Sequence, residues 1–202
     1  MDIDPKDLVD AARAASDRQE ARSTRLNAAV AVTIALLATF MGICKVKDDN
    51  IVQAMQQAQA DKLDHWAFYQ ARNVRQEIAE ATATQLELAR LSAPDASAQA
   101  YDAAIGKYRA LAQEQSKKKE DLKQQAEQDQ KNYDALNYRD DQFDLSDALI
   151  AIAIAMLAVT ALTRLWALYW AALVPTGFGV LMGLAGLTAL PIHPDALMKL
   201  LS

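Results

Sequence analysis

Apolar residues gather in three long runs, and the chain between them is largely polar. The first two runs cover residues 26–44 and 145–163, with Asp147 as the one ionisable side chain in either. The third covers residues 165–190 and follows the second after Arg164 alone. Since about 20 apolar residues cross a hydrocarbon core of about 30 Å, we expect three transmembrane helices, the last two antiparallel.

Residues 45–144 have no apolar run of that length, but they carry helical periodicity almost throughout. The pattern breaks once, at residues 92–97, where Pro94 disfavours helical geometry at Ala93 and Asp95 can cap the next helix. We therefore predict an all-α fold. It consists of three transmembrane helices with a long antiparallel, coiled-coil-like hairpin between the first and the second, each arm about 60–70 Å long.

Each arm of this hairpin shows positions spaced alternately by four and three residues, which is typical of a coiled-coil seam. In the first arm these positions are Ala67, Ala71, Val74, Ile78, Ala81, Gln85 and Leu88. In the second they are Tyr101, Ile105, Tyr108, Ala112, Gln115, Lys119, Leu122, Ala126, Asp129, Tyr133, Leu136, Asp140 and Phe143. Many are small or polar, so we expect this interface to be weak without the membrane segments or further copies of the chain.

The two ends of the chain are polar tails. Residues 1–25 predict a helical tail with Asp4 as N-cap, and residues 191–202 form a C-terminal tail in which His193 lies at the membrane boundary. Positive charge sets orientation: four arginines precede the first span and Arg164 lies between the last two. We expect that side to be cytoplasmic in a bacterial inner membrane, with the hairpin in the periplasm.

Several residues predict helix packing or homo-oligomerisation. Small residues recur on one face of the first span, and the third span contains a GxxxG spacing, both of which let helices approach closely in lipid. Aromatic side chains of the first arm exceed what a two-helix seam can bury. The predicted packing residues are Ala31, Ala35, Ala38, Gly42, Gly179, Gly183, Trp66 and Tyr69.

Charged residues flank the membrane end of the hairpin. Antiparallel register places Lys45 near Asp144 and Lys47 near Asp141 or Gln142. We therefore predict a salt-bridged collar that fastens the first span to the second. The alternative is a Ca²⁺ or Mg²⁺ site built from these carboxylates with Asp140 and Asp147.

The composition argues against several function classes. The net charge is −5, which does not favour nucleic-acid binding, and the single cysteine excludes an intrachain disulfide. His65, near Asp61 and Asp64, offers at most two good metal ligands. We find no nucleophile–base pair and no phosphate-binding or dinucleotide fingerprint, so we expect no enzyme activity and no cofactor.

Two motifs resemble a known family. Residues 66–72, with the sequence WAFYQAR, and residues 139–145, with the sequence RDDQFDL, are similar to motifs of the bacterial membrane-protein family called domain of unknown function 4337. The resemblance covers roughly residues 20–190, including the order of one span, a helical hairpin and two closing spans. It implies a multi-pass membrane protein and transfers no catalytic residue.

We therefore expect a non-enzymatic homo-oligomeric scaffold that presents its hairpin to envelope proteins, with membrane lipids as further partners. The alternatives are an oligomeric pore lined by Thr33, Thr39 or Thr160, or an accessory subunit of a transport complex.

Overall fold

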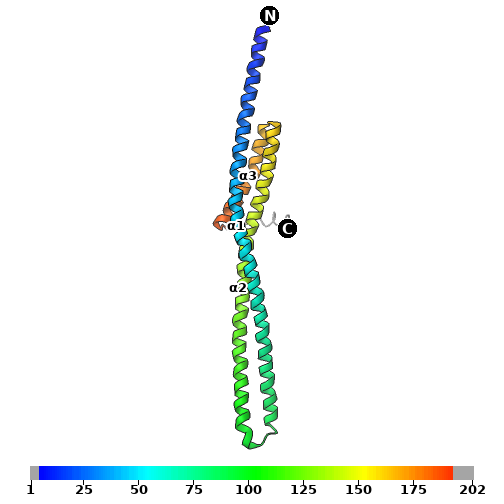
Figure 1. Cartoon of the computed structure of the whole chain (residues 1–202), viewed down its shortest axis with the longest axis vertical. Helices are drawn as coiled ribbons and strands as arrows, with labels where there is room; N and C mark the ends of the chain where they lie inside the picture. Colours follow the sequence, from blue (N-terminus) through cyan, green and yellow to red (C-terminus); the bar gives the residue numbers. More distant parts are fainter. Residues whose placement is uncertain (1–4, 193–202) are drawn as a thin grey trace. The chain divides into compact units, whose positions relative to one another are not determined.

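The computed structural model describes residues 5–192, and the regular structure in that range is entirely helical. Its elements are α1 (Pro5–Arg90), the short 3₁₀ helix η1 (Asp95–Ser97), α2 (Ala98–Thr163) and α3 (Trp166–Thr188) (Figure 1). Within this range three helices are long and apolar enough to cross a membrane. The predicted all-α fold is confirmed, whereas Asp4 and His193 lie outside the described residues.

The chain forms two units, which we call the three-helix unit and the hairpin unit. The first consists of Met1–Ile51 and Tyr138–Ser202, and the second of Val52–Asn137. α1 and α2 contribute to both units and continue without interruption over 86 and 66 residues. The polar residues 45–49 therefore do not end the first helix, because nothing in them opposes helical geometry.

In the three-helix unit, apolar side chains from all three helices form one core. Its fully or almost fully buried members are Leu26, Val30 and Leu37 of α1, Ile150, Ala153 and Leu157 of α2, and Ala172 of α3. A hydrogen bond of 3.1 Å between the hydroxyl groups of Thr33 and Tyr169 joins α1 to α3 within this packing.

Glycines allow α3 to lie very close to its neighbours. A Cβ atom on Gly179 would lie 2.9 Å from Ile150 Cγ1, and one on Gly183 would lie 2.7 Å from both Phe40 and Ser146 Oγ. Ser146 Oγ also donates a hydrogen bond of 2.8 Å to the Gly179 carbonyl. The predicted GxxxG spacing is thus used within the chain, where α3 packs antiparallel to α2.

A tight turn joins α2 to α3. Arg164 adopts a left-handed conformation with φ of 56°, and its backbone N–H donates a hydrogen bond of 2.8 Å to the Thr160 carbonyl. α3 begins at Trp166, so the connection consists of Arg164 and Leu165, one residue more than the predicted span boundaries leave.

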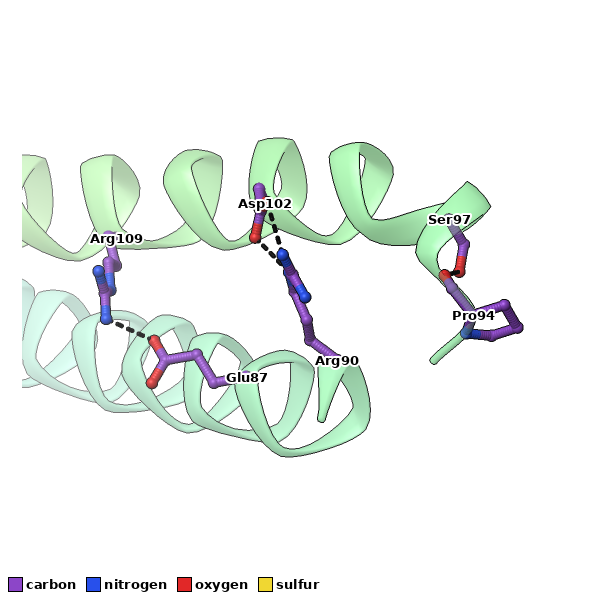
Figure 2. Close-up of polar contacts among 6 residues, drawn as sticks. All are labelled: Glu87, Arg90, Pro94, Ser97, Asp102 and Arg109. Atoms are coloured by element: carbon purple, nitrogen blue, oxygen red, sulfur yellow. Dashed lines mark hydrogen bonds and ion pairs between the residues drawn. The ribbon is translucent and has the colours of Figure 1, made fainter. Parts of the chain in front are cut away.

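The hairpin unit contains α1 and α2 in antiparallel register. As residue numbers rise along α1 they fall along α2, in the contacts Lys62–Gln130, Asn73–Lys119 and Arg90–Asp102. Figure 2 shows the tip, where Arg90 Nε and Nη2 donate to the two carboxylate oxygens of Asp102. Arg109 contacts Glu87 there at 2.8 Å.

The turn between the arms lies at the predicted place. α1 ends at Arg90, and η1 precedes α2. The predicted side-chain cap by Asp95 is wrong: η1 has no side-chain cap, and Ser97 instead donates both its backbone N–H and its hydroxyl to the Pro94 carbonyl (Figure 2). Pro94 is extended, with φ of −60° and ψ of 148°, so its carbonyl can accept both bonds.

Candidate functional site

The inward face of α2 in the hairpin unit is the face that the sequence predicts. Ile105, Ala112, Gln115 and Ala126 are buried, and every other predicted position of this arm is at least partly buried. Phe143, the last predicted position, belongs to the three-helix unit and is 2% exposed. The predicted seam of the second arm is therefore confirmed.

The predicted seam of the first arm is wrong. All seven of its positions are exposed, with Val74 at 52%, Ile78 at 60% and Leu88 at 62% exposure. The face that meets α2 is the opposite one, with the same alternation of spacings. It consists of Lys62, His65, Tyr69, Arg72, Gln76, Ala79, Ala83, Leu86 and Arg90.

Matching chemistry explains which face of α1 turns inward. The α2 face presents polar groups, and α1 supplies partners for them: Arg72 donates to Gln115 Oε1 at 3.0 Å, and His65 Nδ1 lies 2.6 Å from Asp129 Oδ2. Ala79 is buried to 1% exposure, which brings the helix backbones close. A buried polar group without a partner costs about 1–3 kcal/mol, so the loss of these partners would be unfavourable for both Gln115 and Asp129 and favours this face of α1.

The first family motif contributes to both faces of α1. Tyr69 packs edge-to-face against Trp66, with ring centroids 5.2 Å apart, and Lys119 Nζ lies 5.8 Å from the Tyr69 ring centroid. Trp66 and Phe68 remain 36% and 59% exposed. Tyr69 thus belongs to the intramolecular seam, and Trp66 to the outer surface.

The second family motif holds the end of α3 in the three-helix unit. The Arg139 guanidinium donates to the Gly186 carbonyl at 2.9 and 3.3 Å, and Gln142 Nε2 donates to the carbonyls of Leu190 and Ile192 at 2.8 and 2.7 Å. A Cβ atom on Gly186 would lie 2.8 Å from the Phe143 ring. Arg139 thus satisfies a carbonyl of the last turn of α3, which has no intrahelical partner, and Gln142 holds the residues that follow the helix.

The predicted collar is formed differently. Lys45 Nζ contacts Asp48 Oδ2 at 2.8 Å and Asp49 Oδ1 at 3.5 Å, both on its own helix, rather than Asp144. Lys47 is exposed and does not make the predicted bridge to Asp141. Acidic partners three and four residues along the same helix are within reach of a lysine in any register, so they take precedence over a cross-helix pair.

A carboxylate pair takes the place of the collar. Asp48 is 4% exposed, and its Oδ1 atom is buried without a hydrogen-bond donor. The Asp140 carboxyl faces Asp48: burial raises the pKa of Asp140 to about 6, and a hydrogen bond to Asp48 and the charge of Asp144 raise it as well. Burial also raises the pKa of Asp144, with nearby Asp48 as the second cause. Asp48 is not among the residues predicted from the sequence, although its spacing from Cys44, Ile51 and Met55 follows one buried face.

The predicted packing residues divide into two groups. Gly179 and Gly183 are buried in the three-helix unit, whereas the small-residue face of α1 is exposed at Ala31, Ala35 and Ala38. Gly42 is also exposed, with no atom within 4 Å of a Cβ placed on it.

The threonines predicted to line a pore bond to their own helices. Thr33, Thr39 and Thr160 each donate a hydrogen bond of 2.8 Å to the carbonyl four residues earlier. In residues 5–192, no group of three or more His, Cys, Asp and Glu side chains is placed to hold a metal ion.

The fold defines an all-α membrane-protein class, with three helices able to cross a bilayer and a helical hairpin between the first and the second. A family model, Domain of unknown function (DUF4337), matches residues 26–189. The chain belongs to this family, as its two motifs indicate. Neither a curated protein nor a solved structure matches the chain.

Proposed function

We propose that the protein is a non-enzymatic, homo-oligomeric scaffold of a bacterial inner membrane, whose hairpin unit binds further copies and envelope proteins. The observation that carries this proposal is the apolar stripe on the outer face of α1, which we define as Leu63, Ala67, Ala71, Val74, Ile78, Ala81 and Leu88. Leu63 is 59% exposed, and the large side chains further along the stripe are equally open.

The spacing of this stripe favours another helix as its partner. Its positions from Leu63 to Ala81 recur every three or four residues, and Leu88 follows seven residues later with Gln85 between them, so they form one line along α1. A helix of a second copy can pack against this line by the same rule. Exposed apolar surface of this extent on a single helix face is typical of an interaction site. The exposed small residues of α1 in the three-helix unit offer a second contact of the kind that brings helices together in lipid.

Orientation follows from the arginines that precede the first span and from Arg164, which favour a cytoplasmic N-terminus and a periplasmic hairpin unit. In that position the stripe would face envelope proteins rather than cytoplasmic ones.

The experiment compares two double variants of the full-length protein by mass photometry in detergent. V74E/I78K replaces two stripe residues but keeps the net charge and adds a favourable i,i+4 pair, so helix formation is preserved. We expect it to lower the mass of the particles to that of fewer copies, because charged groups cannot be buried unpaired in an apolar interface.

The matched control is Q124E/Q128K, which makes the same exchange at two exposed positions of α2. It should keep the wild-type mass. If V74E/I78K assembles like the wild type, or if the wild type is a monomer, the stripe does not join copies and this proposal is wrong.

A further inference from the structure

Four arginines surround the turn between α2 and α3 in the three-helix unit. One cavity of about 620 Å³ is lined by Arg18 and Arg22 of α1 together with Arg164 and Trp166. A second cavity of about 590 Å³ shares Arg18, Arg22 and Trp166 with the first and adds Arg25 and Trp170. Because they share these residues, we treat them as one groove, which we call the arginine groove.

The arginine groove carries uncompensated positive charge. Elsewhere Arg90 and Arg109 pair with carboxylates, but none of the four groove arginines has an ion-pair partner in the part of the chain that the structure describes. The arginines of α1 share one side of that helix because they are separated by four and three residues. An anion in the groove would therefore meet several guanidinium groups and no opposing carboxylate among the lining residues.

The start of α3 adds donors to the same place. Its N-cap residue, Leu165, makes no side-chain capping bond, so the N–H groups of Trp166 and Ala167 lack intrahelical acceptors, whereas Leu168 N–H donates to the Leu165 carbonyl at 3.1 Å. The N-terminus of a helix favours an anion through these groups and through its dipole.

Apolar surface borders the groove. Trp170 is 63% exposed, and Leu162 and Leu165 at the turn are 84% and 54% exposed. α2 and α3, which meet at this turn, are both apolar enough to cross a membrane. The charged groove therefore lies at the end of a membrane-spanning segment, where a lipid places its headgroup against tryptophan rings and its acyl chains against aliphatic side chains.

We propose that the arginine groove binds the phosphate group of an anionic glycerophospholipid. One guanidinium group can donate two parallel N–H bonds to two oxygens of a phosphate. Basic pockets between membrane helices bind anionic lipid headgroups. A free phosphate ester would share this recognition of the phosphate. The adjoining apolar surface assigns the site to the lipid.

The test uses native mass spectrometry of the full-length protein in detergent, titrated with dioleoylphosphatidylglycerol, dioleoylphosphatidylcholine or glycerol phosphate. We expect one or two phosphatidylglycerol molecules to bind at concentrations at which neither of the other two compounds does. Equal binding of the two lipids would overturn the preference for an anion. Equal binding of glycerol phosphate and phosphatidylglycerol would overturn the assignment to a lipid.

The R18Q/R22Q variant tests the location. Each basic residue near a membrane surface contributes about 1 kcal/mol to the binding of anionic lipid, a factor of about five, so we expect the Kd for phosphatidylglycerol to rise about 25-fold. Both residues are exposed, so the variant should keep its fold, and the lipid preference of the wild type tests the proposal without any substitution.

The control is R13Q/R75Q, which removes the same charge at two exposed arginines of α1 outside the groove. It should bind phosphatidylglycerol within about twofold of the wild type. An equal loss in both variants would show that only overall charge matters, and no loss in R18Q/R22Q would show that the lipid binds elsewhere. Either result overturns the proposal.

Discussion

The two units contain parts of the same two helices, yet they are held together differently. In the three-helix unit the buried face of α1 carries Leu26, Val30 and Leu37, and a third helix packs against it through glycines. In the hairpin unit the inward face of the same helix is mostly charged, polar or alanine, with few large apolar side chains such as Met55 and Leu86. Several of its aliphatic residues, such as Val74 and Ile78, point outward.

The difference shows that apolar character alone does not decide which helix face packs inward. In lipid, burial of apolar groups gives little driving force, so close backbone approach and hydrogen bonds such as that from Ser146 to Gly179 hold the helices together. In water, polar side chains can face each other if each finds a partner, and the apolar face then remains free for another molecule.

Replacing Gly183 with leucine should have the largest effect on this comparison. The added Cβ would lie 2.7 Å from both Phe40 and Ser146, in a packed region where three helices meet and the neighbours have little room to move. Overpacking of this kind costs about 1–3 kcal/mol or more, so we expect the melting midpoint in detergent to fall by about 10 °C.

Gly177→Leu is the control for this change, because nothing lies within 4 Å of a Cβ placed there. It makes the same substitution on the same helix and should keep the wild-type midpoint. An equal midpoint for the two variants would contradict the close packing at Gly183.

Much of the fold follows from the sequence alone, because uninterrupted apolar runs identify membrane helices and Pro94 marks the turn of the hairpin. The seam of the second arm also follows, since its apolar and polar positions share one face. The first arm has two plausible faces, and the more apolar one, with Val74 and Ile78, is not the one that α2 meets. Periodicity identifies such a face but does not say which molecule covers it.

The contacts at the carboxylate pair and at the end of α3 were beyond prediction for another reason. Gln142 reaches carbonyls 48 and 50 residues further along the chain, and no local pattern encodes that contact. For Lys45 the sequence does show acidic residues three and four positions away, and the predicted partner on α2, Asp144, is wrong because these local partners bind Lys45 instead.

Replacing Ala83 with leucine should have an intermediate effect, and it tests the inward face of the hairpin unit directly. Ala83 is 4% exposed, so a larger side chain would force α1 and α2 apart. We expect a loss of about 1–3 kcal/mol in local stability, seen as faster hydrogen exchange of peptides from residues 70–90 and 100–120.

Ala81→Leu is the matched control, two residues away on the exposed stripe. Exchange should slow or stay unchanged there, because position 81 faces away from α2, so a leucine adds an apolar side chain to the stripe and does not separate α1 from α2. Faster exchange in A81L than in A83L would show that the sequence-predicted face is the packed one after all.

The smallest expected effect is a pH dependence of the melting midpoint, which arises from Asp140 in the three-helix unit. Since the pKa of Asp140 is raised to about 6, the folded unit binds a proton more tightly than the unfolded chain, in which this carboxyl has its ordinary pKa. The stabilisation is therefore fully present at low pH and is lost as the pH rises through about 6.

The groups facing Asp140 are Asp48 on α1, and Asp141 and Asp144 on its own helix, and the charge of each opposes the ionisation of Asp140. We expect the melting midpoint to lie about 2–4 °C higher at pH 5 than at pH 7.5. Asp140→Asn should remove most of this dependence, because the amide keeps a hydrogen-bond donor toward the Asp48 carboxylate and cannot ionise. Asp49→Asn changes an exposed carboxylate one residue beyond Asp48 and should leave the pH dependence of the midpoint unchanged. A wild-type midpoint that rises from pH 5 to pH 7.5 would show that the Asp48–Asp140 pair does not share a proton in the folded protein.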